Sequence, residues 1–154
     1  HYPVRYDARA DKIVEATLPK PYETDNSPVP TTTQGTSGNL TPDYYYAWCW
    51  THFDDELEEE SPSGWSPTGD TAVFYEKLGA TNTSIQIDFS AVKTPNHEAD
   101  KTADNPQIDK LQIFRTNGAA TLEEIQQAIT NMEWFYDGEI AVGGTHTSHS
   151  ADGP

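Results

Sequence analysis

The chain has 154 residues, the length of one ordinary domain, and its 11% of aromatic residues is too high for a disordered chain. We therefore expect a folded domain with long polar loops. Nine basic residues against 25 acidic ones give a formal net charge of −16, which repels phosphate backbones and anionic lipid headgroups. This charge argues against nucleic-acid binding. No run approaches the roughly 20 apolar residues of a membrane span, so the sequence also argues against membrane insertion.

The first 39 residues are predicted to form an extended arm or long loop with a short strand at residues 12–18. The chain starts at His1 rather than at Met, as expected for either a processed terminus or a trimmed fragment. Residues 20–42 are rich in Pro, Thr, Ser and Gly and show no apolar period. We expect residues 40–154 to form a β-sandwich domain.

A clear strand pattern lies at residues 44–51. Tyr44, Tyr46, Trp48 and Trp50 occupy one face, and Tyr45, Ala47, Cys49 and Thr51 occupy the other. Cys49 is alone in the sequence, which excludes an intrachain disulfide and a cysteine-rich zinc site. The segment Asp54-Asp55-Glu56-Leu57 ends the strand, and residues 58–63 are predicted to return as a second, acidic edge strand with solvated carboxylates.

Further strands are predicted at residues 71–76, 84–91, 109–116 and 133–142. Ile85, Ile87, Phe89 and Ala91 alternate with polar residues and are expected to point inward. One short helix is predicted between two strands, because Thr121 and Glu124 form a capping box and Leu122, Ile125 and Ile129 have helical spacing. These elements favour an all-β fold, an antiparallel two-sheet sandwich with one inserted helix.

The sequence Leu40-Thr41-Pro42-Asp43-Tyr44-Tyr45-Tyr46 resembles the Leu-x-Pro-x-x-x-Tyr corner that opens strand F of fibronectin type III domains. The resemblance implies that the Tyr46 hydroxyl bonds back to the backbone and that Trp48 and Trp50 lie in the core. Residues 60–63 are similar to the chain that leaves strand F toward strand G.

Residues 111–116, 136–140 and 147–152 are similar to strands C, C′ and E of such domains. Because the segment similar to strands F and G comes first in the chain, the resemblance implies either a permuted single sandwich, which we prefer, or a fragment that joins two domains. Related strands are familiar from phage tail, neck and head-surface proteins. The resemblance therefore implies a structural role in a virion.

Familiar catalytic signatures are absent from the sequence, including phosphate-binding loops and Gly-x-Ser-x-Gly. One alternative is a copper histidine brace, as in lytic polysaccharide monooxygenases, built on His1. Its second imidazole would come from His52, His97, His146 or His149. We interpret His146 and His149 as solvated loop histidines.

Other candidate sites have both a structural and a functional interpretation. Glu98, Asp100, Asp104 and Asp109 could bind Ca²⁺ from a long loop, although their spacing is not that of a helix–loop–helix calcium site. The acidic pairs Asp54/Asp55 and Glu123/Glu124 are interpreted as surface charge, and the sequons at Asn39 and Asn82 as chance occurrences. Trp48, Trp50 and Trp134 are either buried or a carbohydrate platform, and we favour burial.

The sequence thus favours a non-catalytic structural or interaction module of a virion or extracellular assembly. Its expected partners are other subunits of the same assembly, and we predict no catalytic, cofactor or metal site. The alternative is an extracellular carbohydrate-binding or adhesion module with a surface glycan as its ligand. A copper oxidase that uses His1 is the third hypothesis.

Overall fold

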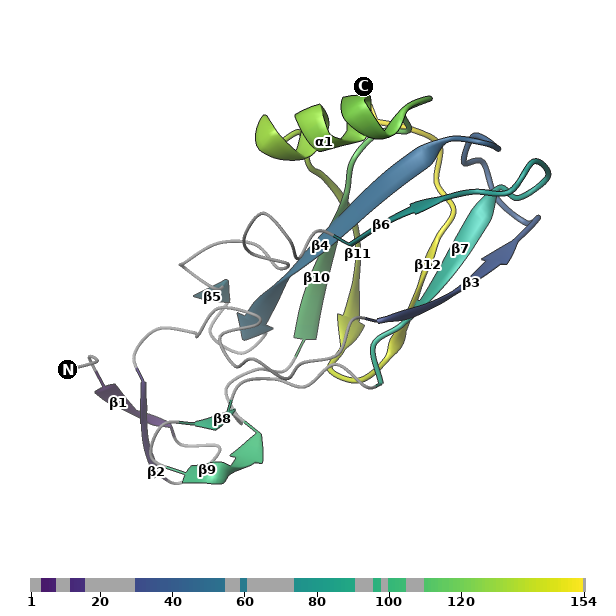
Figure 1. Cartoon of the computed structure of the whole chain (residues 1–154). Helices are drawn as coiled ribbons and strands as arrows, with labels where there is room; N and C mark the ends of the chain where they lie inside the picture. The colour runs from purple at the N-terminus through teal and green to yellow at the C-terminus, as the bar shows by residue number, and fades with distance from the viewer. Residues whose placement is uncertain are drawn as a thin grey trace.

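The computed structural model describes residues 30–54, 74–90 and 110–153, together with the backbone of five short strands that lie outside these ranges. The five are β1 (Val4–Asp7), β2 (Lys12–Glu15), β5 (Glu59–Glu60), β8 (Asn96–His97) and β9 (Asp100–Asp104). β1 pairs with β2, and β8 pairs with β9, both antiparallel. The described part of the chain is mostly β, with two antiparallel sheets in a sandwich-like arrangement and one short helix (Figure 1).

The larger sheet is built around β4 (Tyr45–Asp54), which is long because aromatic and β-branched residues favour a strand. Its order is β11 (Phe135–Ala141), β10 (Lys110–Arg115), β4 and β5. β6 (Phe74–Lys77) pairs with residues 45–48 of β4, and β5 pairs with its last two residues. β5 confirms the predicted short acidic edge strand, because Phe53 pairs with Glu60 and Asp54 with Glu59.

The smaller sheet has the order β12 (Thr145–Ser148), β7 (Ser84–Asp88) and β3 (Thr31–Gly35). The predicted strand at residues 84–91 is confirmed as β7, with Ile85, Ile87 and Phe89 fully buried and Gln86 exposed. The predicted strands at 109–116 and 133–142 are confirmed as β10 and β11.

β3 is a strand that the sequence analysis missed, because it lies inside the segment 1–39 predicted as an arm. Its residues are Thr-Thr-Thr-Gln-Gly, polar but β-branched, and they pair with β7 along its whole length. Gln34 then links β3 to the other sheet: its Nε2 donates to the Lys77 carbonyl at 3.0 Å and its Oε1 accepts from Gly79 N at 2.8 Å. These bonds help to hold the two sheets together along one side of the sandwich.

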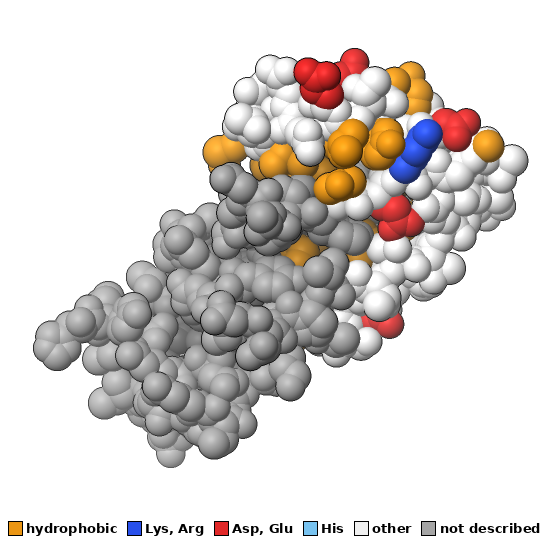
Figure 2. Space-filling model, in the orientation of Figure 1, with side chains coloured by type: hydrophobic (Ala, Val, Ile, Leu, Met, Phe, Trp, Pro, Cys, Tyr) orange, Lys and Arg blue, Asp and Glu red, His pale blue; other side chains and the backbone are white. Residues whose placement is uncertain are grey.

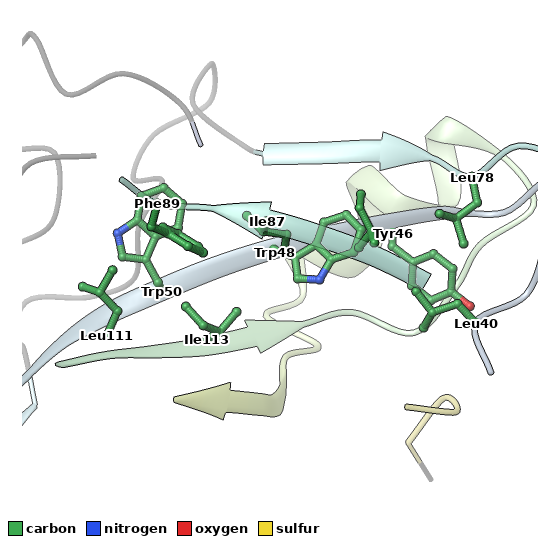
Figure 3. Packing of buried hydrophobic residues seen from close by; sticks show 10 residues of the cluster. Leu40, Tyr46, Trp48, Trp50, Leu78, Ile87, Phe89, Leu111 and Ile113 are labelled. Atoms are coloured by element: carbon green, nitrogen blue, oxygen red, sulfur yellow. The ribbon is translucent and has the colours of Figure 1, made fainter. Parts of the chain in front are cut away.

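The core lies between the two sheets and is formed by ten buried residues (Figure 3). They are Leu40, Tyr46, Trp48, Trp50, Leu78, Ile85, Ile87, Phe89, Leu111 and Ile113. Trp50 and Phe89 form an edge-to-face pair with centroids 5.2 Å apart, and Trp48 Nε1 donates to Ser148 Oγ at 3.1 Å. These two contacts join the strands of opposite sheets. The burial of Trp48 and Trp50 confirms the favoured interpretation of both residues.

The predicted helix is confirmed as α1 (Leu122–Thr130), inserted between β10 and β11. Both bonds of the capping box are present: Glu124 N donates to Thr121 Oγ1 at 3.3 Å, and Thr121 N donates to Glu124 Oε2 at 3.1 Å. Ile125 is the buried residue of the helix. Figure 1 shows α1 lying across one end of the sheets, near the C-terminal end of the described chain.

Candidate functional site

A buried ionic network connects three strands of the two sheets. Arg115 of β10 places Nη1 at 3.4 Å from Asp137 Oδ1, and His146 of β12 places Nε2 at 2.7 Å from Asp137 Oδ2. The side chains of Arg115 and Asp137 are only 5% and 4% exposed. Arg115 Nη1 also donates to Ser148 Oγ at 3.2 Å, so the network reaches the hydroxyl that Trp48 contacts. We call Arg115, Asp137, His146 and Ser148 the Arg115 network.

The charge of Asp137 is stabilised within this network. Burial raises the pKa of its carboxyl, but the hydrogen bond with His146 and the positive charge of Arg115 lower it, and the balance lies below the ordinary value. Gly138 leaves room for the imidazole, because a Cβ at this position would lie 2.6 Å from His146 Cε1. The network is buried away from solvent, and its contacts link the two sheets.

Residues 149–153, which we call the C-terminal strap, are held against the end of β10. Arg115 donates from Nη1 to the Ser150 carbonyl at 3.1 Å and from Nη2 to the Ala151 carbonyl at 3.2 Å. Asn117 makes two bonds with Gly153: its Nδ2 donates to the carbonyl at 3.2 Å, and its Oδ1 accepts from the amide at 2.8 Å. The strap thus fixes the position of the loop that follows β10.

An open cleft of about 680 Å³ lies beside α1, in the size range of ligand sites. It lies between the helix, the turn after it, and the loop after β10, and we call it the α1 cleft. It is lined by Tyr44, Asn117, Gly118, Ala119, Ala120, Glu124, Ala128, Met132, Glu133, Trp134 and Phe135. The cleft therefore combines aromatic rings, a thioether and two carboxylates.

Backbone bonds position one wall of the α1 cleft. Tyr45 N donates to the Ala119 carbonyl at 2.8 Å, and Ala119 N donates to the Tyr45 carbonyl at 2.9 Å, so the loop is fastened to the start of β4. Gly118 packs against the corner tyrosine, because a Cβ there would lie 2.7 Å from the Tyr46 hydroxyl. This wall is preformed, which lowers the entropic cost of binding a ligand.

The rim of the α1 cleft exposes large hydrophobic side chains. Met132 is 61% exposed and Tyr44 is 36% exposed, and both line the cleft. On the face shown in Figure 2, hydrophobic side chains also gather below α1, next to a basic side chain and with acidic side chains at several places around them. Exposed apolar groups clustered beside a cleft are typical of a binding surface.

The structure places several of the predicted site residues. Trp134 is partly buried and lines the α1 cleft, whereas Trp48 and Trp50 lie in the core, so a platform of all three tryptophans is wrong. Glu123 and Glu124 are exposed in the first turn of α1, and only Glu124 lines the cleft.

The interpretation of His146 as a solvated loop residue is wrong. It lies on β12, is buried, and contacts Asp137, whereas His149 is exposed. The short Thr-His-Thr-Ser strand is polar, so its alternation gave no hydrophobic signal. The sequence analysis also missed Arg115. This residue continues the inward face of Leu111 and Ile113 in β10, and a charged residue at an inward position of a strand could have indicated a buried ion pair.

The two sequons lie on the described surface. Asn39 is exposed, and its backbone amide donates to the His149 carbonyl at 2.8 Å. The side-chain amide of Asn82 donates to Gln34 Oε1 at 2.7 Å.

The remaining candidate residues lie outside the part of the chain whose side chains are described. They are His1, His52, Asp54, Asp55, His97, Glu98, Asp100, Asp104 and Asp109. Among the residues that the structure does describe, no three or more His, Cys, Asp or Glu side chains gather in a way that could hold a metal ion. In the same residues, no helix has the length and apolar character needed to cross a membrane.

Comparisons with protein-family models, with curated proteins and with solved structures gave no match to this chain. The features of this chain that bear on its function are therefore the geometry of the α1 cleft and the arrangement of the strands.

Proposed function

We propose that this chain is a non-catalytic interaction module of a virion or extracellular assembly and that it contacts other subunits through the α1 cleft. The observation that carries the proposal is the open, preformed cleft with Tyr44 and Met132 exposed at its rim. Aromatic side chains and methionine are the residue types enriched at protein–protein interfaces.

The strand arrangement supports a permuted fibronectin type III-like architecture for this module. In sandwiches of this type, strands C, F and G share one sheet, and B and E share the other. If β4 is strand F, its neighbours β10 and β6 take the places of C and G, and β7 with β12 takes the places of B and E. Tyr46 supports the same assignment, since its hydroxyl accepts from Thr41 N at 2.9 Å.

Sedimentation of the native source material tests the assembly role. We expect the chain to travel with particles or filaments, detected by mass spectrometry of peptides from each fraction. A chain that remains a free monomer in every fraction contradicts the proposal.

A carbohydrate-binding module is the second candidate function, and the place of Trp134 in the α1 cleft favours it. Tryptophan faces stack on sugar rings, and a solvated cleft allows such contacts. Titration with soluble glycans should quench tryptophan fluorescence, and a Trp134→Phe variant should lose that quenching. An unchanged spectrum with a broad glycan panel contradicts this second function.

A further inference from the structure

We propose that the α1 cleft binds the cationic side chain of a lysine or arginine in a basic segment of the partner subunit. This inference rests on the proposed interaction function and assigns the chemistry of the partner. Its first support is the charge of the cleft: among the described residues that line it, Glu124 and Glu133 are acidic and none is a lysine or arginine.

The aromatic residues of the cleft suit a cation as well. Tyr44, Trp134 and Phe135 line the same space as the two carboxylates. The negative face of an aromatic ring attracts an ammonium or guanidinium group, and carboxylates add charge-assisted hydrogen bonds. One ligand group can therefore use both kinds of contact in this cleft.

The neighbouring tyrosines already hold cations of the chain itself. Lys77 Nζ lies 5.5 Å from the centroid of the Tyr45 ring, and Arg115 Cζ lies 5.4 Å from that of Tyr46. Tyr44, the tyrosine just before them, turns its exposed ring to the cleft. A cation of the partner over the Tyr44 ring would make the same kind of cation–π contact that Tyr45 and Tyr46 make within this chain.

Other ligand types fit the charges less well. An anionic ligand would meet Glu124, Glu133 and the field of a chain with net charge −16. An entirely apolar ligand would remove water from the two carboxylates without replacing their hydrogen bonds. A basic segment satisfies the carboxylates and is attracted from a distance by the net charge.

One carboxylate is already oriented for this role. Glu124 Oε2 accepts from Thr121 N at 3.1 Å in the capping box, which holds the side chain in place and leaves its other oxygen for a ligand. The cleft volume of about 680 Å³ exceeds a single side chain, so the ligand is a short segment of chain and not one residue alone.

The test uses the full chain and two blocked pentapeptides. One is Gly-Arg-Lys-Arg-Gly, and the other carries citrulline and Nε-acetyl-lysine in place of the basic residues, which keeps the length and removes the charge. Binding is measured by isothermal titration, and the contact site is mapped by amide chemical shifts. We expect the charged peptide alone to bind, with shifts at Gly118, Ala119 and Met132.

Matched variants separate the cleft from the general acidity of the chain. Glu133→Gln should weaken binding of the charged peptide about two- to fivefold, as expected for a solvent-accessible ion pair. Trp134→Leu should weaken it about threefold or more. Glu123→Gln removes the same charge one residue from Glu124 but outside the cleft, so binding should stay within experimental error of the unchanged chain.

Three outcomes would overturn the inference. The neutral peptide could bind as well as the charged one, or Glu123→Gln could weaken binding as much as Glu133→Gln. Glycans could bind at Trp134 while the charged peptide does not, which would establish the second candidate function in its place. Co-sedimentation with particles is measured independently, so the assembly role can survive the failure of the basic-segment inference.

Discussion

Tyr46 shows how this chain buries a large side chain that carries a polar atom. The ring is fully buried in the core, and its hydroxyl accepts a hydrogen bond from Thr41 N, five residues earlier in the chain. Burial raises the pKa of the phenol, so the group stays protonated. The bond ties the segment before β4 to the end of the sandwich.

Replacing this tyrosine by phenylalanine tests the contribution of the hydroxyl. Tyr46→Phe keeps the ring but leaves Thr41 N without its acceptor, so we expect the free energy of unfolding to fall by about 1–2 kcal/mol. Urea denaturation measures the change, and Tyr75→Phe, at an exposed ring on β6, is the control. Equal stability of the two variants would show that the corner bond contributes nothing.

Asp137 makes the stability of the fold depend on acid. Its pKa in the folded chain lies below the ordinary value of 3.8, so its stabilising effect is fully present above that value and is lost as pH falls through the lower, folded-state pKa. At neutral pH, Asp137→Asn should cost about 3–5 kcal/mol, because Arg115 remains buried with only the more exposed Asp152, 4.0 Å away, as a counter-charge.

Comparing Asp137→Asn with the unchanged chain separates the effect of the Asp137 carboxylate on stability from the effects of the other acids. The difference in unfolding free energy between the unchanged chain and Asp137→Asn should shrink as the pH drops below about 4. Denaturant titrations at a series of pH values measure it. Asp152→Asn is the control, because that carboxylate is 33% exposed and 4.0 Å from Arg115, and a difference that stays constant with pH would contradict the argument.

At the level of elements, α1 ends in an unusual way. Met132 N donates to the Ile129 carbonyl at 3.0 Å, and Glu133 N donates to the Ala128 carbonyl at 2.9 Å, which is the bond pattern of a Schellman motif. The residue at the left-handed position of this motif is commonly glycine, but here it is Met132 with φ of 55°. The helix therefore ends with a strained residue whose side chain is exposed at the rim of the α1 cleft.

Two substitutions separate the strain at Met132 from the role of its side chain. Met132→Gly relieves the left-handed conformation, and we expect thermal or urea unfolding to show a gain of about 0.5–1 kcal/mol. Met132→Ala keeps the strain and should give no gain. Both variants should weaken the peptide binding proposed for the cleft. If Met132→Gly is no more stable than Met132→Ala, the backbone at Met132 is not strained.

For the whole molecule, β4 is a central strand, because it is buried on both faces and only one of them meets the other sheet. Tyr46, Trp48 and Trp50 face the core between the sheets, and Ala47 and Cys49 are buried on the other side of the strand. Burial also raises the pKa of the Cys49 thiol, which keeps it from forming the reactive thiolate. Reagents should reach this thiol only when the strand leaves the sheet.

The reaction of Cys49 with a disulfide reagent should therefore report unfolding. We expect labelling of the native chain to be at least about 10³-fold slower than labelling in denaturant. The rate is followed by thiol release, and a Cys49→Ser variant gives the background. Rapid labelling without denaturant would show that β4 opens locally while the rest of the fold persists.

The sequence alone predicted the elements whose signal is local. Alternation located β4 and β7, the capping box located α1, and the Leu-x-Pro-x-x-x-Tyr pattern located the hydrogen bond of Tyr46. These features depend on neighbouring residues along one strand or one helical turn, so the spacing of those residues in the sequence is enough to predict them.

Tertiary structure decided what depends on residues distant in the chain. β3 is a strand because β7 supplies its hydrogen bonds, and His146 is buried because Asp137 is folded against it. The α1 cleft combines Tyr44 with residues 117–135, which are brought together by the pairing of Tyr45 with Ala119. Polar segments carry no hydrophobic period, so their burial and their place in a site are set by partners that only the fold brings near.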